Sequence, residues 1–97
     1  MTENQYMDPG DLIRLIDRTE KGDPMACITL GRLYHSGTMV PRNMKRAESL
    51  YYSAELSGDT ESLRVLGGMY LNGDCARTST SKAAELFRKA AQKNDAL

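Results

Sequence analysis

The strongest constraint on the fold is an internal repeat with a period of 36 residues. When residues 22–57 are aligned with residues 58–93, nine of the 36 positions are identical. The identical pairs are Gly22/Gly58, Asp23/Asp59, Leu30/Leu66, Gly31/Gly67, Tyr34/Tyr70, Gly37/Gly73, Ala47/Ala83, Leu50/Leu86 and Ala54/Ala90. Periods of about 20 to 50 residues are typical of stacked-repeat proteins. Residues of these types shape a backbone or fill a core, and none of them forms a catalytic set.

Each repeat unit is predicted to fold into two helices. In the first unit Ala26, Leu30, Leu33 and Tyr34 lie on one helical face, and Gly37 follows as a C-terminal glycine. This pattern predicts helices over residues 24–36 and 60–72, which begin at the cap residues Asp23 and Asp59. The i, i+3, i+4, i+7 spacing of Ala47, Leu50, Tyr51 and Ala54, repeated by Ala83, Leu86, Phe87 and Ala90, predicts helices over 43–57 and 81–93.

A shorter apolar stretch precedes the first repeat. Leu12, Ile13, Leu15 and Ile16 match neither helix of the repeat, and the terminal units of stacked repeats are usually atypical. We therefore expect a capping helix over residues 9–20. The 97 residues are then one domain, with the cap in 1–21, the repeats in 22–57 and 58–93, and a tail in 94–97.

Charge and cysteine content exclude several functional classes. Thirteen Lys and Arg residues balance thirteen Asp and Glu residues, so no net positive charge favours nucleic acid or an acidic membrane surface. No apolar run is long enough for a membrane span, and the acidic N-terminal residues do not resemble a secretory signal, so we expect a cytoplasmic protein. Two cysteines and one histidine predict no metal site. Two cysteines are enough for one disulfide, between Cys27 and Cys75, but the reducing cytosol favours two thiols.

Glycine recurs inside the first helix of each unit, at Gly31 and Gly67. Glycine in a helix interior lowers stability by about 1 kcal/mol relative to alanine, so its recurrence at the same repeat position suggests that it has a structural role there. We expect close approach of the two helices of each hairpin, whose facing residues are also small. The aromatic residues Tyr34, Tyr51, Tyr70 and Phe87 would then fill the space between successive hairpins.

The combined pattern resembles a known repeat family. The residues Gly-Asp-Pro-x-Ala-x-x-x-Leu-Gly-x-x-Tyr-x-x-Gly over 22–37, followed by Ala-x-x-Leu-Tyr-x-x-Ala-x-x-x-Gly over 47–58, look like the Sel-1-like repeat. The second copy has Thr60 in place of Pro and Ser62 in place of Ala. This resemblance implies an all-α fold, an α/α superhelical solenoid of two helical hairpins with five helices including the cap. It also implies an adaptor without cofactors, in a family with many bacterial members.

The resemblance places a partner-binding groove along the first helix of each hairpin. The side chains that point away from the packing stripe there are predicted to bind a protein or peptide. They are Met25, Ile28, Thr29, Arg32, His35, Glu61, Arg64, Val65, Leu71 and Asn72. A peptide with apolar anchors and an acidic group suits this mixture, because arginine recognises carboxylates in a fork geometry. The alternative is that the arginines are merely solvated.

Four further interpretations follow from the same residues. A dedicated chaperone for one partner, or an immunity-type inhibitor of a bacterial effector, is the alternative function. Catalysis by His35 is not favoured, because no residue in a recognisable motif would orient its side chain. The C-terminal edge, with Leu86 and Phe87 on one side and Ala84, Ala91 and Leu97 near the end, is predicted to associate with a second copy or with the partner. The basic residues Arg42, Lys45 and Arg46 are interpreted as a solvated face rather than a nucleic-acid site.

Overall fold

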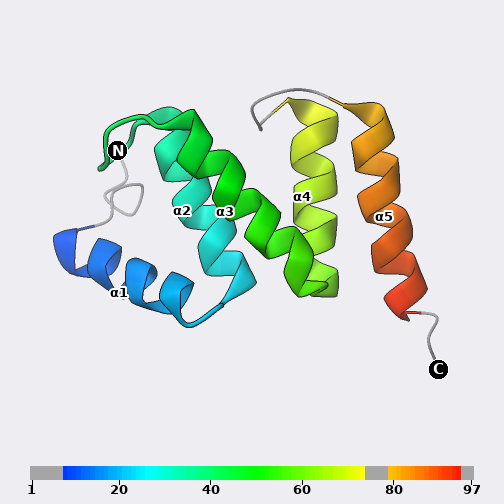
Figure 1. Cartoon of the computed structure of the whole chain (residues 1–97), viewed down its shortest axis with the longest axis horizontal. Coiled ribbons are helices and arrows are strands. Elements are labelled where there is room, and N and C mark those ends of the chain that lie inside the picture. Colours follow the sequence, from blue (N-terminus) through cyan, green and yellow to red (C-terminus); the bar gives the residue numbers. More distant parts are fainter. Residues whose placement is uncertain (1–7, 74–78, 95–97) are drawn as a thin grey trace, which may run out of the picture.

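The computed structural model describes residues 8–73 and 79–94, and five α-helices account for most of them (Figure 1). The helices are α1 (Pro9–Glu20), α2 (Pro24–Ser36), α3 (Met44–Ser57), α4 (Thr60–Asn72) and α5 (Thr80–Asn94). All five helices were predicted, and the observed ends differ from the predicted ones by no more than one residue. None of the helices in this part of the chain is long and apolar enough to cross a membrane.

Local capping explains why the first helix of each hairpin begins and ends where it does. The Asp23 side chain accepts hydrogen bonds from the backbone N–H groups of Met25 and Ala26, and Pro24 occupies the first turn, where its missing N–H costs nothing. The helix ends at Gly37, whose φ of 76° is a left-handed conformation that favours glycine. Because Asp59 and Gly73 repeat these roles in α4, both helices have the same length.

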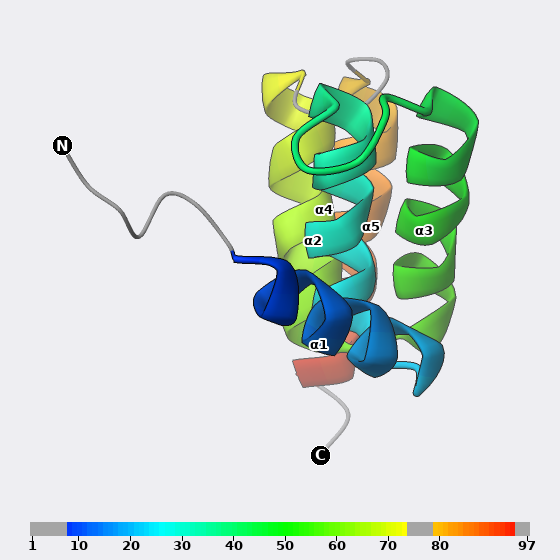
Figure 2. The same cartoon turned by 90° about the vertical axis from the view of Figure 1, so that its left-hand side faces the viewer.

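The helix α1 covers one end of the first hairpin. Figure 2 shows α1 running across α2. Its buried side chain is Leu15, 3% exposed, which packs with Ala26 and Leu30 of α2. Asp8 starts α1 with a capping box, in which its side chain accepts from the Asp11 N–H and the Asp11 side chain accepts from the Asp8 N–H. The predicted capping helix is therefore confirmed.

The other four helices form two hairpins, α2 with α3 and α4 with α5, stacked side by side (Figures 1 and 2). One hydrophobic cluster runs through both hairpins and includes Ile28 of α2, Leu63 and Leu66 of α4, and Leu86 of α5. This shared core makes the two hairpins one unit. The arrangement confirms the predicted all-α solenoid.

The repeated glycines make room for an aromatic ring. A Cβ atom built on Gly31 would lie 2.6 Å from Cε1 of Tyr51, and one on Gly67 would lie 2.7 Å from Cε1 of Phe87. The helices of each hairpin do approach closely, as predicted, since the same Gly31 Cβ would lie 3.3 Å from the carbonyl oxygen of Ala47. Tyr51 and Phe87 each lie against the glycine of their own hairpin, because only a residue without a side chain leaves space there. Tyr51 also belongs to the core shared by the two hairpins, as expected, whereas Phe87 is 39% exposed.

Candidate functional site

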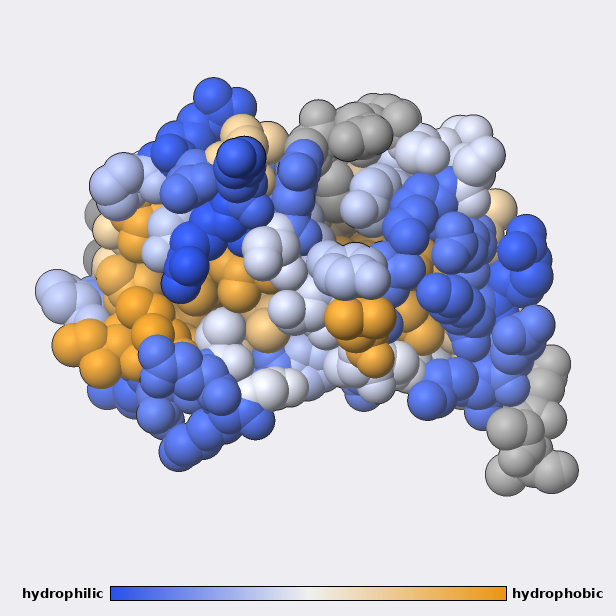
Figure 3. Space-filling model, viewed as in Figure 1, coloured by the Kyte–Doolittle hydropathy of each residue, from blue (hydrophilic) through white to orange (hydrophobic). Residues whose placement is uncertain are grey.

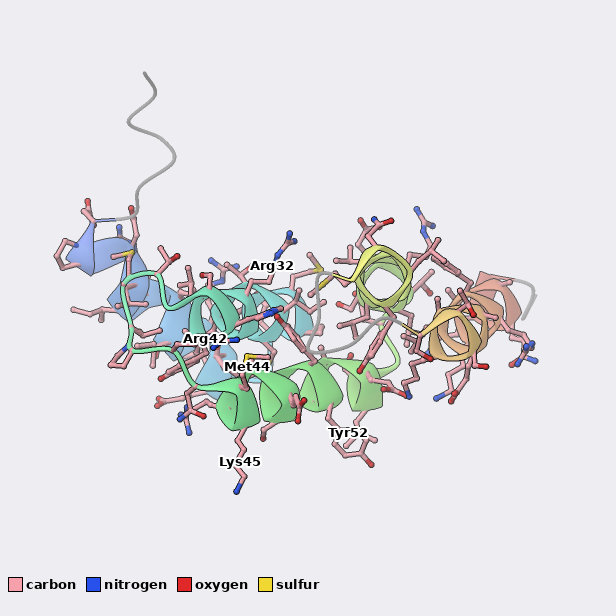
Figure 4. All side chains as sticks on the ribbon, turned by 90° about the horizontal axis from the view of Figure 1, so that it is seen from above. Arg32, Arg42, Met44, Lys45 and Tyr52 are labelled. Atoms are coloured by element: carbon pink, nitrogen blue, oxygen red, sulfur yellow. The ribbon has the colours of Figure 1, made fainter. Side chains whose placement is uncertain are left out.

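The first helices of the two hairpins, α2 and α4, contact each other and share one side of the molecule (Figure 2). On α2, Arg32 is exposed, whereas Met25, Thr29 and His35 are half-buried. Figure 4 shows Arg32 extending from α2 on the side away from α3. The predicted α2 residues other than Ile28 therefore reach the surface.

Ile28 is a correction to the predicted groove. Its side chain is 1% exposed and lies in the core shared with α4 and α5. The position faces the following hairpin, and stacking buries it. The 36-residue repeat gives Arg64 the same position in the second hairpin, where it is exposed. Arg64 is therefore accessible, and its place in the groove stays a prediction.

The remaining predicted residues on α4 are accessible. Glu61, Leu71 and Asn72 are exposed, with Leu71 at 49%, and Val65 is half-buried. Glu61 forms an ion pair with Arg64 at 3.8 Å, and because both side chains are more than half exposed, this pair contributes little to stability. We call the surface formed by Thr29, Arg32, His35, Val65, Leu71 and Asn72 the α2–α4 surface.

A pocket of about 420 Å³ lies at the C-terminal end of this surface. It brings together residues of α2, of the loop that follows α2, and of the end of α4. The lining residues are Arg32, Leu33, His35, Ser36, Arg42 and Gly73. Arg32 and His35 were predicted to bind a partner, but Arg42 was not. Its participation depends on the path of the loop, for which the sequence offers one signal, the left-handed glycine at position 37 that turns the chain back.

Comparisons with known proteins identify the repeat. A family model described as the Sel1 repeat matches residues 24–59 and 60–95, which together make up most of the chain. The chain belongs to the Sel1 repeat family. The Sel1 frame has the same 36-residue period as the repeat found in the sequence, offset by two residues. The family is a non-catalytic repeat scaffold that generally mediates protein–protein interaction.

A solved Sel1 repeat structure supports the same assignment. The crystal structure of a Sel1 repeat protein from Oxalobacter formigenes is similar over 86% of this chain, with 25% sequence identity and a TM-score of 0.65. The match covers 62% of that protein's length. No curated protein matches the sequence.

An ion-pair network also joins the two hairpins. Glu55 of α3, whose side chain is 9% exposed, accepts hydrogen bonds from Nζ of Lys82 at 2.8 Å and Nζ of Lys89 at 3.2 Å. Burial alone would raise the pKa of Glu55, but the two lysines outweigh it and hold the pKa below its ordinary value of 4.5. The network therefore stabilises the contact between α3 and α5 as long as Glu55 is ionised.

A second pocket, of about 490 Å³, opens beside this network. Its residues come from the C-terminal end of α3, the start of the second Sel1 repeat and the last turns of α5. They are Glu55, Leu56, Gly58, Leu63, Lys89, Gln92 and Lys93. Leu56 is 68% exposed, and Figure 3 shows hydrophobic surface near this end of α3 among hydrophilic residues. No prediction from the sequence concerned this pocket.

The open edge of the second Sel1 repeat differs from its predicted composition. Leu86 is completely buried, so it does not belong to the edge, because its side chain points into the core between the hairpins. Phe87 is 39% exposed, whereas its repeat equivalent Tyr51 is 2% exposed beneath the second hairpin. Ala84 and Ala91 are exposed, and Leu97 lies outside the described residues. Association of this edge with a second copy stays a prediction, which light scattering would test.

The described residues also bear on cysteine and metal chemistry. Cys27 is a free thiol, 5% exposed, and burial raises its pKa above the ordinary value of 9.0. Cys75 lies outside the described residues. Within residues 8–73 and 79–94, no group of three or more His, Cys, Asp or Glu side chains could hold a metal ion.

Proposed function

We propose that this Sel1 repeat protein is a non-catalytic interaction module that binds a segment of another protein on the α2–α4 surface. The observation that carries this proposal is that packing positions and surface positions of the repeat differ in how alike the two units are. Positions that pack, such as Leu30/Leu66, are the same in both units, whereas surface positions such as Arg32/Gly68 and His35/Leu71 differ. Packing positions serve the shared architecture, so the surface positions are free to suit a ligand.

The composition of the α2–α4 surface indicates the kind of segment that it suits. Val65 and Leu71 offer apolar contacts, and Arg32 offers a planar guanidinium that can bind a carboxylate with two parallel hydrogen bonds. A partner segment with apolar side chains and an acidic group complements both. We place this activity in the cytoplasm, in keeping with Cys27 as a free thiol.

A capture experiment with matched variants tests the proposal. The variant Arg32→Glu/Leu71→Glu changes one cation and one apolar residue on the α2–α4 surface. The control, Lys45→Glu/Tyr52→Glu, likewise replaces one cation and one large side chain by Glu, on α3. Figure 4 shows Lys45 and Tyr52 projecting from the side opposite to Arg32. Circular dichroism checks that both variants remain folded.

The proposal predicts that the first variant loses the partners that the native chain captures and that the control retains them. Equal capture by the two variants would exclude the α2–α4 surface as the binding site. Stoichiometry adds a second result. Several substoichiometric partners would support an adaptor, whereas one stoichiometric partner would support the dedicated chaperone or inhibitor.

A further inference from the structure

The charges of this chain are unevenly distributed along the sequence. Residues 24–47 contain Arg32, Arg42, Lys45 and Arg46 together with the only histidine, and they contain no Asp or Glu. Because the whole chain has a formal charge of zero, the remaining residues carry a net charge of −4. The helix α2, the loop after it and the first turn of α3 therefore form a basic segment on an otherwise acidic molecule.

Among residues 8–73 and 79–94, the cations of this basic segment have no carboxylate partner. Outside the segment, six Arg or Lys side chains in the described part of the chain lie within 4 Å of a carboxylate oxygen. They are Arg14, Arg18, Lys21, Arg64, Lys82 and Lys89. Within the segment, no described carboxylate lies that close to Arg32, Arg42, Lys45 or Arg46, and Arg46 instead stacks over the ring of Tyr34, 5.5 Å from its centroid. The segment thus leaves positive charge available to a ligand.

Local geometry turns two of these cations toward one pocket. Gly37 ends α2 in a left-handed conformation, and a Cβ atom there would lie 3.2 Å from Cβ of Arg42, so the loop folds back against the helix end. The Nε of Arg42 then donates a hydrogen bond to the carbonyl oxygen of His35 at 3.0 Å. This bond anchors Arg42 by Nε, and the terminal nitrogens of Arg42 have no hydrogen-bond partner among the described residues, so they are available to a ligand. Arg42, Arg32 and His35 all line the same 420 Å³ pocket.

The pocket lies at the C-terminal ends of two helices, whose dipoles disfavour a bound anion, so the positive charge of the arginines must outweigh this effect. The C-terminal ends of α2 and α4 each place roughly half a negative charge near Ser36 and Gly73, which disfavours an anion. Arg32 and Arg42 carry two full positive charges, and the bond from Arg42 satisfies one exposed carbonyl of α2. The pocket is therefore suited to an anionic group in spite of the helix dipoles.

We propose that the pocket lined by Arg32, His35 and Arg42 binds the carboxylate side chains of an acidic segment in the partner protein. This inference rests on the proposed function and names the chemistry that the partner supplies. Leu33 also lines the pocket, so an apolar side chain next to the acidic residue would be buried there. A volume of about 420 Å³ lies at the small end of ligand pockets and admits one or two side chains rather than a folded surface.

A protein segment suits the pocket better than a polynucleotide. A long polyanion would extend beyond the basic segment and meet the rest of the chain, which carries net negative charge. A short acidic segment places its charge only at the pocket. The apolar Leu33 likewise has no role in binding a bare phosphate.

Fluorescence anisotropy with a defined probe tests this inference. The probe is a short fluorescein-labelled peptide of Glu, Leu and Gly, compared with the same peptide carrying Gln in place of Glu. The variant Arg32→Gln/Arg42→Gln is compared with Arg88→Gln/Lys93→Gln, which removes two exposed α5 cations that also have no carboxylate within 4 Å in the described residues. Arg32→Gln alone is included because no hydrogen bond or ion pair of its side chain within the described residues is lost.

The native chain is expected to bind the Glu peptide at least about tenfold more tightly than the Gln peptide, because charge-assisted hydrogen bonds are replaced by neutral ones. The pocket variant should weaken binding by a similar factor, Arg32→Gln by several-fold, and the α5 variant hardly at all. Equal loss in the pocket and α5 variants, or equal binding of the two peptides, would overturn the inference. Tighter binding of a single-stranded oligonucleotide, or full competition by inorganic phosphate, would also overturn it.

Partner capture separates this inference from the proposed function. If Leu71→Glu abolishes capture while Arg32→Gln/Arg42→Gln does not, the α2–α4 surface binds the partner without the carboxylate pocket. If neither variant affects capture, the proposed function itself fails. The inference stands only if the pocket variant reduces both peptide binding and partner capture.

Discussion

Substituting alanine for the two repeated glycines should have unequal effects, although the glycines occupy the same repeat position. The added Cβ would meet Tyr51 at 2.6 Å in Gly31→Ala and Phe87 at 2.7 Å in Gly67→Ala, so the clash is nearly the same. The neighbouring rings differ in their freedom to move. Tyr51 is 2% exposed and enclosed by the second hairpin, whereas Phe87 is 39% exposed at the open edge.

The expected magnitudes follow from two opposing contributions. Alanine in a helix interior is favoured over glycine by about 1 kcal/mol, and overpacking a core costs about 1 to 3 kcal/mol. Because Tyr51 cannot move away, Gly31→Ala should lower the free energy of unfolding by about 1 to 2 kcal/mol. Phe87 can swing toward solvent, so Gly67→Ala should be neutral or stabilising by up to about 1 kcal/mol. Gly68→Ala, whose Cβ would meet nothing within 4 Å, isolates the helix-propensity gain.

Thermal and urea unfolding followed by circular dichroism measure these differences. For a chain of this size, 1 kcal/mol corresponds to a shift of about 4 to 8 °C in the unfolding midpoint. Gly31→Ala should therefore unfold at a clearly lower temperature than Gly67→Ala, with Gly68→Ala at or above the native midpoint. Equal destabilisation of the two repeat-equivalent variants, or a greater loss in Gly67→Ala, would show that enclosure of the ring does not decide the outcome.

Two further predictions concern charge and backbone conformation. Because the folded pKa of Glu55 is lowered, its contribution to stability is complete above the ordinary pKa of 4.5 and is lost as the pH falls through the folded value. Glu55→Gln should therefore lower the free energy of unfolding by about 1 to 2 kcal/mol at pH 7, and the variant should lose less stability than the native chain between pH 5 and 3 in urea unfolding. An unchanged acid dependence would contradict the role of the network. Met39 has a φ of 65°, a left-handed conformation that favours glycine, and its side chain is 39% exposed. Met39→Gly should therefore raise the free energy of unfolding by about 1 kcal/mol in the same assay. A decrease would show that the side-chain contacts of Met39 outweigh the backbone strain.

The helices were predictable because their signals are local. Asp23, Pro24 and Gly37 lie within or beside the helix that they start or end, and the apolar spacing is read within one turn or two. The repeat then adds a second, independent copy of the same signals. Caps, periodicity and repetition agree, and the structure follows them closely.

The errors arose where stacking, rather than the helix itself, decides a side chain's environment. Ile28 and Arg64 occupy the same repeat position, but only Ile28 has a hairpin packed over it. Similarly, Leu86 was expected at the edge and lies in the core. A single helix does not specify which of its faces the next hairpin covers, so these assignments needed the tertiary arrangement.

The pocket and the ion-pair network were missed for a related reason. Arg42 joins Arg32 only because the loop folds back at Gly37, a path that residue types alone do not determine. Glu55 meets Lys82 and Lys89, which lie 27 and 34 residues further along the chain. Contacts at such separations carry no local pattern, and so they appear only when the hairpins are placed together.

Site-specific photo-crosslinking tests the central claim, that the α2–α4 surface meets the partner, most directly. A photoreactive side chain is introduced singly at Leu71 or Asn72 on that surface, and at Lys45 or Tyr52 on the opposite side of the molecule (Figure 4). We expect the first two positions to crosslink the same partner and the last two not to. Crosslinks to that partner from Lys45 and Tyr52, with none from Leu71 and Asn72, would contradict it.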